Sequence, residues 1–241
     1  MPTSIDQAYE IQFASIAQWP DDVAGWKVAR LPPHDRGKFP AERLAGPVFA
    51  RTVREVEAGA KSVGQIYEGG FAAIEAEFIL EIGMKIPPSD REWSDQDILE
   101  HIAAAYGGAE IASSPMPSAI ELGCMAIIPD LGINTGIIVG PEIPEFESLS
   151  ADALSIRVSV DGGVVGEARP GPIAGAPFEA IRFLIGHCGR HGIELPAGSL
   201  VSTGLLTAAH EVTVGSIARV DYGPFGWFEV EFEAAPRGKR R

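Results

Sequence analysis

The sequence predicts an α+β protein that is rich in β-strands and is built as one domain with a few covering helices. Segments with β-branched or apolar strand patterns outnumber helical ones and cluster late in the 241 residues. Hydrophobic residues make up 46% of the chain, which is ample for a sizeable core. The sequence has no repeat and no linker between separate cores. We therefore expect a single domain over 1–241, with a helical N-terminal segment at 1–24 and a flexible basic tail at 237–241.

The N-terminal part is predicted to start with a helix over residues 5–19. Apolar residues recur there at helical spacings, Ser4 is placed to cap the helix, and Pro20 ends the pattern. A short strand is expected at 25–29. Residues 31–47 are dense in proline, glycine and charge without clear periodicity, so we expect a long loop there.

The middle of the chain is predicted to hold a second helix followed by two strands. Ser94 and two nearby aspartates form an acidic first turn, an apolar stripe runs on to Ala105, and Gly107-Gly108 would end the helix. Residues 119–128 and 135–139 are apolar and β-branched. These two segments are expected to be strands.

The second half is predicted to contain a hairpin, a third helix and closing strands. Segments 154–160 and 164–167 flank Asp161-Gly162-Gly163, which is a hairpin turn pattern. Pro177 fits the first turn of a helix that ends at His191-Gly192. Strands are expected at 200–203, 216–221 and 227–232. The glycines between 162 and 175 lack the strand, turn and helix spacing of a nucleotide-binding loop.

Charge and cysteine usage narrow the class of protein. The formal net charge of -14 would repel nucleic acid and anionic lipid, so neither is an expected partner. Cys124 and Cys188 lie far apart in apolar surroundings and are expected to be reduced and buried. The start of the chain lacks a signal-peptide pattern, and no segment is long and apolar enough to span a bilayer. A cytoplasmic location is expected.

Glu75-Ala76-Glu77 places two carboxylates inside the apolar run at 71–80. Alternation along a strand would put both on one face and the apolar side chains on the other. Two close carboxylates repel each other, and a divalent cation relieves that repulsion. The alternative is a half-buried strand whose polar side faces water.

Several segments, taken in order along the chain, match one family pattern. They are Gly25-Trp26-Lys27-Val28, the Glu75-Ala76-Glu77 strand, Ser118-Ala119-Ile120-Glu121, and residues 136–140, 175–180, 195–204 and 225–230. This series resembles the 2-keto-4-pentenoate hydratase and 4-oxalocrotonate decarboxylase branch of the fumarylacetoacetate hydrolase superfamily. The resemblance implies a mixed, rolled, barrel-like sheet flanked by a few helices, like the C-terminal domain of that superfamily. It also implies a homo-oligomer.

The resemblance implies a site for Mg²⁺ or Mn²⁺ made by Glu75, Glu77 and Glu121. Three carboxylate ligands would leave other positions of an octahedral ion for water or substrate. The expected substrate is a small-molecule unsaturated 2-oxo acid from aromatic-compound degradation, whose enolate the cation would stabilise. Lys27 matches the family's active-site lysine, and Thr203 would offer its hydroxyl to the substrate. Without the resemblance, Lys27 could equally be an exposed strand-end residue, and Thr203 a β-branched residue before a turn.

Departures from the family pattern leave the reaction open. Pro47-Val48-Phe49-Ala50 lacks the family's aspartate, and the residues after Glu121 lack its Asp-Ser-Arg motif. The first hypothesis is a metal-dependent lyase, either a hydratase or a decarboxylase. The second is a C–C hydrolase of the acylpyruvate or fumarylacetoacetate type, in which His34 supplies the catalytic base; a solvated loop histidine is the alternative for His34. The third is a relative that binds ligands without turnover.

Overall fold

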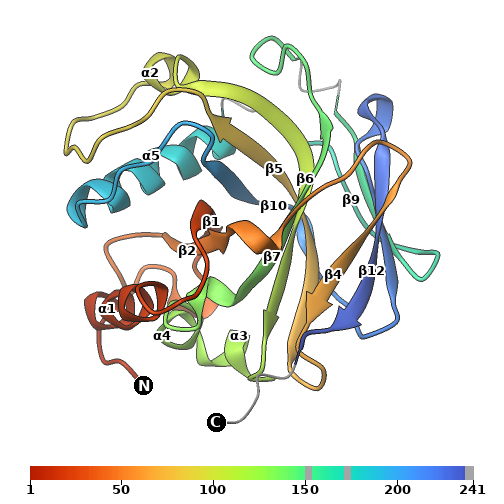
Figure 1. Cartoon of the computed structure of the whole chain (residues 1–241), viewed down its shortest axis with the longest axis horizontal. Coiled ribbons are helices and arrows are strands. Elements are labelled where there is room, and N and C mark those ends of the chain that lie inside the picture. Colours follow the sequence, from red (N-terminus) through yellow and green to blue (C-terminus); the bar gives the residue numbers. More distant parts are fainter. Residues whose placement is uncertain (150–153, 171–174, 237–241) are drawn as a thin grey trace.

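The computed structural model describes residues 1–149, 154–170 and 175–236, so the predicted basic tail at 237–241 lies outside the described residues. Two curved sheets pack against each other, and helices gather at one side of the larger sheet (Figure 1). The predicted β-rich α+β class is confirmed. Among the described residues, no helix has the length and apolar character needed to cross a membrane.

The larger sheet is mixed and rolled. Within the described residues it has seven strands, in the order β2 (Arg43–Phe49), β1 (Val23–Arg30), β10 (Leu200–Glu211), β5 (Phe71–Ile82), β6 (Ile102–Ser114), β7 (Asn134–Glu142) and β3 (Val53–Glu55). The β1–β10 and β3–β7 pairs are parallel and the others antiparallel. Because β2 also contacts β7, the sheet curls round toward a barrel.

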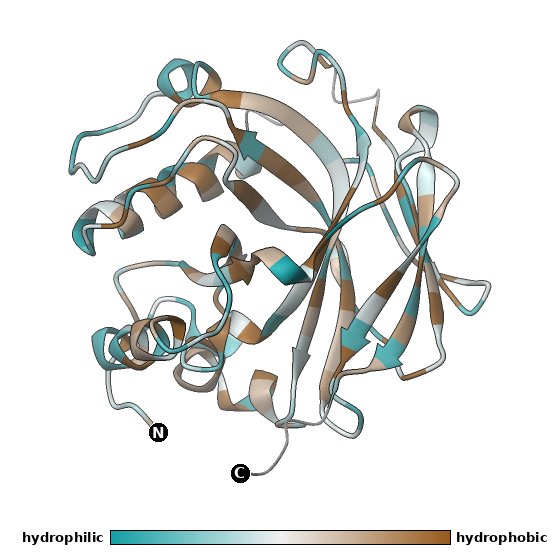
Figure 2. Ribbon diagram, viewed as in Figure 1, coloured by the Kyte–Doolittle hydropathy of each residue, from teal (hydrophilic) through white to brown (hydrophobic). Residues whose placement is uncertain are grey.

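The smaller sheet covers the outer face of the larger one. Its described strands run in the order β4 (Lys61–Ile66), β12 (Trp227–Ala234), β11 (Ile217–Asp221), β8 (Ile156–Val160) and β9 (Gly163–Ala168). Hydrophobic residues, coloured brown, occupy much of the middle of the strands in both sheets (Figure 2). The main core includes Phe78 of β5 together with Phe228 and Phe232 of β12, all buried. The predicted hairpin at 154–167 is confirmed as β8–β9.

Two of the three predicted helices are confirmed in place, although the first ends at Ile16 rather than at Trp19. α1 (Ile5–Ile16) is capped by the Ser4 side chain, and α5 (Ala176–Arg190) has proline in its first turn. The two helices meet through aromatic rings, with the Tyr9 and His187 ring centroids 4.4 Å apart. α5 also contacts β1, β2 and β10, so it supports the strands that carry Lys27 and Thr203.

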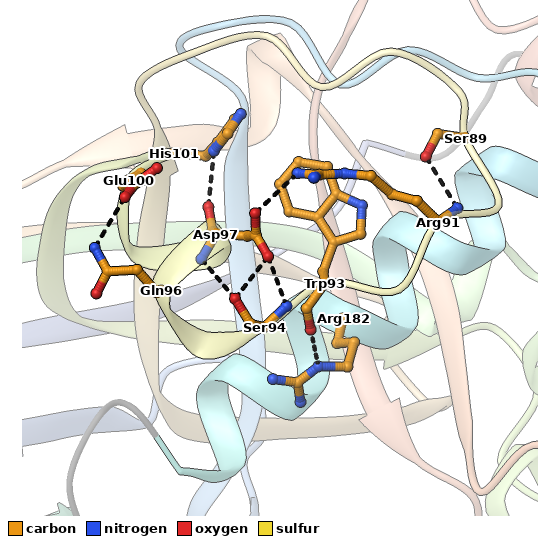
Figure 3. A network of polar contacts seen from close by, with 9 residues as sticks. All are labelled: Ser89, Arg91, Trp93, Ser94, Gln96, Asp97, Glu100, His101 and Arg182. Atoms are coloured by element: carbon orange, nitrogen blue, oxygen red, sulfur yellow. Dashed lines mark hydrogen bonds and ion pairs between the residues drawn. The ribbon is translucent and has the colours of Figure 1, made fainter.

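The second predicted helix is much shorter than expected. α2 (Asp95–Leu99) begins at Ser94 as predicted, and Ser94 and Asp97 form a capping box there (Figure 3). The Arg182 side chain of α5 donates to the Trp93 carbonyl at 2.8 Å (Figure 3). The prediction that the helix continues to Gly107 is wrong, because β6 starts at Ile102. Gly107 lies inside the strand, where a β-carbon would come within 2.5 Å of the Tyr222 ring. The glycine is needed for packing between the sheets.

Two other assignments are corrected. The expected strand at 119–128 is a pair of short helices, α3 (Ala119–Leu122) and α4 (Cys124–Ile127), because a short apolar run does not distinguish a buried strand from a buried helix. The expected loop at 31–47 contains the 3-10 turn η1 (Pro33–Asp35) and most of β2. Pro47 is tolerated in β2 because that strand lies at the sheet edge.

Three further 3-10 turns complete the fold: η2 (Ala50–Thr52), η3 (Leu131–Ile133) and η4 (Gly223–Phe225). Of these, η3 contacts α1, α4, β2 and β6, and so helps to close the inner side of the rolled sheet. Both cysteines are buried and free, as expected.

Candidate metal centre and adjoining cavity

Three buried carboxylates meet on the inner face of the rolled sheet. Glu75 and Glu77 come from β5, and Glu110 comes from β6, where it lies directly opposite Glu75 in the antiparallel register. One oxygen of each lies within 4.8 Å of the others. Glu77 and Glu110 are 0% exposed and Glu75 is 8% exposed. We call these three residues the carboxylate trio.

The predicted alternation of β5 is confirmed, but the alternative interpretation, in which the polar face of this strand is exposed to water, is wrong. Glu75 and Glu77 do share one face, and Ala76 and Phe78 belong to the core on the other. In that alternative, Glu75 and Glu77 would point into solvent. The side of β5 that carries Glu75 and Glu77 is buried instead, because the sheet curls over it and η3 packs against β2 and β6. A strand buried on both faces cannot leave such charges uncompensated.

Burial makes the ionised form of the trio costly. Burial and the neighbouring Glu110 raise the pKa of Glu75 to about 8, although Lys27 opposes the shift. Burial, Glu110 and Glu75 raise the pKa of Glu77 well above its ordinary value, against hydrogen bonds from Ser202 and Gly204. A bound cation would reverse this effect, since it favours the ionised form of every carboxylate around it.

Hydrogen bonds orient the trio but leave two of its oxygens without partners. The Ser202 hydroxyl and the Gly204 backbone N–H, the latter at 2.8 Å, donate to Oε2 of Glu77. The Asn134 amide donates to Oε1 of Glu110 at 3.0 Å. Among the described residues, no hydrogen-bond partner reaches Oε1 of Glu77 or Oε2 of Glu110, although both atoms are buried. Buried, unpaired carboxylate oxygens are the ligands that a hard cation requires.

Lys27 is the cation that faces the trio. Its Nζ lies 3.1 Å from Oε1 of Glu110, and the residue is 3% exposed. Burial lowers the pKa of Lys27, but Glu110, Glu75 and Glu77 together raise it above its ordinary value, so the side chain is protonated. With all three carboxylates ionised, one ammonium leaves two negative charges uncompensated. That deficit equals the charge of Mg²⁺ or Mn²⁺, and the residues therefore fit such an ion.

Backbone strain is concentrated beside Lys27. Leu131 and Ile133 in η3 have φ angles of 54° and 55°, which are unfavourable for residues with branched side chains. Between them, Gly132 comes so close to the lysine that a β-carbon would lie 3.1 Å from its Cε atom. The same turn is followed by Asn134, which holds Glu110. The strained turn thus positions two groups around the trio.

A cavity of about 500 Å³ adjoins the trio. Lys27, Glu75, Thr203 and Gly204 contribute polar groups to its lining, while much of the remaining wall is apolar, including Ile120, Ile127 and Ile133. Thr203 is buried, and its hydroxyl donates to the Phe78 carbonyl at 3.0 Å. A mostly apolar cavity with a few convergent charged groups is typical of a small-molecule site.

The structure brings four of the six predicted site residues together. Lys27, Glu75, Glu77 and Thr203 lie at the trio or its cavity. The inclusion of Glu121 in the metal site is a misassignment, because this residue is exposed on α3 and is not part of the trio. Its expected strand is a helix, so the alternation argument does not apply to it.

His34 lies on η1, beside the cavity rather than among its lining residues. Its Nε2 is 3.7 Å from Oδ2 of Asp35, and its side chain is 45% exposed. Asp35 in turn accepts a hydrogen bond from the Cys124 backbone N–H at 2.8 Å, which ties η1 to α4. Burial opposes the ionised form of Asp35, but hydrogen bonds from Cys124 and the nearby His34 lower its pKa below the ordinary value.

Glu110 is the member of the carboxylate trio that the sequence analysis missed. The signal was a lone carboxylate among alanine, glycine and isoleucine in residues 102–114. It was overlooked because that stretch was predicted to be a helix end followed by a glycine stop. Only when the stretch is paired with β5 does Glu110 come opposite Glu75.

Comparisons with known proteins find similarity in structure alone. No protein-family model matches the chain, and no curated protein matches it. The fold is similar to 4-oxalocrotonate decarboxylase from Pseudomonas putida G7 complexed with magnesium and adipate, with a TM-score of 0.74 and 19% identity, covering 95% of this chain and 86% of that one. Fumarylpyruvate hydrolase from Pseudomonas aeruginosa, in complex with Mn²⁺ and pyruvate, has a TM-score of 0.59 and 17% identity, covering 87% and 89%.

A third similar structure is 5-carboxymethyl-2-hydroxymuconate delta-isomerase from Mycobacterium smegmatis, with a TM-score of 0.58 and 13% identity, covering 90% of this chain and 82% of that one. The chain therefore shares its fold with these three enzymes, and this agrees with the fold that the sequence resemblance implied. The decarboxylase, the hydrolase and the isomerase catalyse different reactions on one fold, so the fold does not identify the reaction.

Proposed function

We propose that this protein is a divalent-metal-dependent enzyme that acts on an unsaturated 2-oxo acid, as a hydratase or a decarboxylase. One observation carries the proposal: a buried carboxylate trio with two unpartnered oxygens adjoins a cavity that also holds a buried lysine. The structural similarity to a decarboxylase complexed with magnesium and adipate supports it.

Glu75, Glu77 and Glu110 would hold Mg²⁺ or Mn²⁺. When bound, the cation would supply charge stabilisation for a 2-oxo acid that develops negative charge on its keto oxygen. Ser202, Gly204 and Asn134 keep the carboxylates oriented for this task, since each donates a hydrogen bond to an oxygen of Glu77 or Glu110. Such supporting hydrogen bonds fix ligand geometry.

Lys27 would bind an anionic oxygen of the substrate. One of its ammonium protons is directed to Glu110, which leaves donors for a group in the cavity. Because Lys27 is buried and protonated, its charge acts in surroundings of low dielectric, where it is stronger than in water. The apolar wall would pack against the hydrocarbon part of the acid and keep water away from the carboxylate trio.

The lyase proposal is tested by dienol consumption. Purified protein with Mg²⁺ or Mn²⁺ is expected to bleach the ultraviolet band of 2-hydroxypentadienoate or of its carboxylated relatives, and chelation with EDTA should stop the reaction. The hydratase and decarboxylase assignments both fail if the band persists with either metal. Release of CO₂ distinguishes decarboxylation from hydration.

A C–C hydrolase is the second candidate, because fumarylpyruvate hydrolase shares the fold and His34 borders the cavity next to Asp35. Cleavage of an acylpyruvate by the wild-type protein, and its loss in His34→Ala, would favour this reaction. Equal cleavage by both proteins would exclude His34 as the base.

A relative that binds ligands without turnover is the third candidate, favoured by the missing aspartate in Pro47-Val48-Phe49-Ala50, at the end of β2, and by the missing Asp-Ser-Arg motif. Thermal-shift screening of 2-oxo acids, with and without metal, separates binding from catalysis. Assembly into a homo-oligomer, a cytoplasmic location and a role in aromatic-compound degradation remain predictions.

A further inference from the structure

Tyr222 lies behind the carboxylate trio, on the side of β5 and β6 that faces the smaller sheet. It directly follows β11, it is 0% exposed, and it belongs to the main core together with Phe78 and Phe228. Its hydroxyl oxygen lies 2.8 Å from the Glu77 carbonyl oxygen and 2.5 Å from the Gly108 carbonyl oxygen. The residue that ends a strand of the smaller sheet therefore contacts the backbone of a trio member.

The hydroxyl of Tyr222, rather than its ring, needs an explanation. The ring packs over Gly107, and its centroid lies 6.4 Å from that of the Phe78 ring, so phenylalanine would supply similar packing. A hydroxyl that is removed from water costs free energy unless it is hydrogen-bonded. Both contacts of this hydroxyl are with carbonyl oxygens, which only accept, so the phenol is the donor in each.

The hydroxyl bridges the two strands that carry the trio. Glu77 and Gly108 are directly opposed in the antiparallel register, two residues along from the Glu75–Glu110 pair. A donor that contacts both carbonyls holds β5 and β6 together at this point. The separation of the two strands in turn governs the distance between the carboxylates that they carry.

The sheet is irregular on both sides of the Glu77–Gly108 pair. β10 has one more residue than β5 between the partners of Ile79 and Glu77. β7 has one more residue than β6 between the partners of Tyr106 and Gly108. Such bulges disrupt the hydrogen-bond ladder and bend the strand, and they are frequent beside active sites. Because both neighbouring ladders are interrupted here, a hydrogen bond from outside the sheet has more influence on the position of the Glu77 backbone.

Glu77 is thus held at both ends of the residue. Ser202 and Gly204 donate to its Oε2 atom, and Tyr222 donates to its backbone carbonyl. Its Oε1 atom is buried and has no hydrogen-bond partner among the described residues. The contacts that fix Glu77 therefore leave one carboxylate oxygen available to a cation.

We propose that Tyr222 is a positioning residue of the metal centre. Its hydroxyl holds the backbone of Glu77 against that of Gly108, and so keeps the carboxylates of the trio at the separation that a divalent cation requires. The inference rests on the metal centre of the proposed function. It adds a residue that touches neither the cation nor the substrate and that comes from the smaller sheet. Hydrogen bonds behind the ligands of a metal fix the geometry of those ligands.

The test removes the hydroxyl of Tyr222 and keeps its ring. We expect the full-length Tyr222→Phe variant to bind Mn²⁺ about 10-fold more weakly than wild type, measured by electron paramagnetic resonance of free Mn²⁺. The spectrum of bound Mn²⁺ should also differ from that of wild type, because it reports the symmetry of the ligands. Placing 4-aminophenylalanine at position 222 restores a donor to both carbonyls and should return the affinity to within about 3-fold of wild type.

Phe228→Leu is the matched control for lost packing. Phe228 is 0% exposed in the same core and comes from β12, but its side chain has no polar atom to offer to β5 or β6. This variant should unfold at a lower urea concentration and yet bind Mn²⁺ within about 2-fold of wild type. For any variant that is only partly folded without metal, the shift of the urea midpoint caused by Mn²⁺ gives the affinity.

The outcomes distinguish the role of Tyr222 from the metal centre itself. Wild-type affinity for Mn²⁺ in Tyr222→Phe overturns the positioning role and leaves the trio as a metal site. Equal losses in Tyr222→Phe and Phe228→Leu, or a loss that 4-aminophenylalanine does not reverse, assign the effect to general loosening of the core and overturn the role as well. If the wild-type protein binds no Mn²⁺, the metal centre is wrong and the role of Tyr222 falls with it.

Discussion

Among single residues, Glu110 has the largest effect on the chemistry proposed for this chain. It completes the carboxylate trio, faces Lys27, and is held by Asn134. Its Oε2 atom is buried without a partner among the described residues. Because hard cations bind through such oxygens, the loss of this one carboxylate should remove both a negative charge and a correctly placed ligand oxygen from the site.

We expect Glu110→Gln to weaken Mn²⁺ binding by at least about 10-fold, because an amide carries no charge to offset the cation. Glu121→Gln is the matched control: Glu121 is exposed on α3 and its variant should bind Mn²⁺ within about 2-fold of wild type. Electron paramagnetic resonance of free Mn²⁺ measures both affinities. Equal losses in the two variants would show that the trio is not the metal site.

The Lys27–Glu110 pair should show strong energetic coupling. Removing one partner of a buried ion pair costs about 3–5 kcal/mol, because it leaves the other charge uncompensated. We therefore expect Lys27→Met to lower the free energy of unfolding by about that amount, and Lys27→Met combined with Glu110→Gln to be more stable than the sum of the single changes predicts.

This coupling is measured by urea unfolding in EDTA, so that metal binding does not contribute. Additive effects in the double variant would mean that the 3.1 Å contact carries no net interaction energy in solution.

At the scale of elements, β1 and β10 and the helix behind them position the site. Lys27 lies on β1 and Thr203 on β10, and these strands are parallel neighbours with Lys27 paired to Ser202. α5 contacts both strands, and α1 packs against α5 through an aromatic cluster of Tyr9, Phe13 and His187. The stability of this cluster should therefore govern how well the strands are held.

His187 makes this cluster sensitive to acid. It is 1% exposed, its Nε2 has no hydrogen-bond partner among the described residues, and burial together with His191 and Arg190 lowers its pKa to about 3. Unfolded histidine has a pKa near 6.5, so between about pH 6.5 and pH 3 the unfolded chain binds a proton that the folded chain does not. His187 therefore lowers stability as the pH falls through that window, by at most roughly 1.4 kcal/mol per pH unit.

We expect His187→Phe to flatten the pH dependence of unfolding between about pH 6 and pH 4, because phenylalanine fits the aromatic surroundings and has no proton to gain. Urea unfolding at several pH values measures the slope. An unchanged slope in the variant would show that other groups set the acid sensitivity.

For the molecule as a whole, metal binding should couple to folding. The carboxylate trio joins β5 to β6, and Lys27 links it to β1, so the site exists only when the sheet has formed. A ligand that binds the folded state alone stabilises it by about 2.7 kcal/mol at a concentration of 100 times Kd.

We therefore expect Mg²⁺ or Mn²⁺ to raise the melting temperature of the full chain, and EDTA to reverse the effect. Ca²⁺ is a useful comparison, because a 4-oxalocrotonate decarboxylase of this fold is complexed with calcium and acetate. Glu77→Gln should abolish the rise, since Glu77 is a member of the trio. A shift that persists in this variant would place the stabilising ion elsewhere.

Much of the architecture could be predicted from the sequence, because it depends on local signals. Ser4, Pro177 and the Asp161-Gly162-Gly163 turn marked elements that the structure contains. The Glu75-Ala76-Glu77 alternation placed two carboxylates on one face of a strand. An ordered series of short motifs indicated the fold, and the similar structures agree with it. The single-domain organisation stays a prediction.

The tertiary structure determined which glutamate joins Glu75 and Glu77 as the third carboxylate. Glu110 and Glu121 are both lone glutamates in apolar stretches, and the sequence analysis selected Glu121. Pairing of β6 with β5 brought Glu110 opposite Glu75, whereas Gly123, at a φ of 75°, separates two short helices and leaves Glu121 in solvent. Periodicity within a segment shows which residues share a face. Which segments are neighbours, and which face is buried, depends on strand pairing across the whole chain.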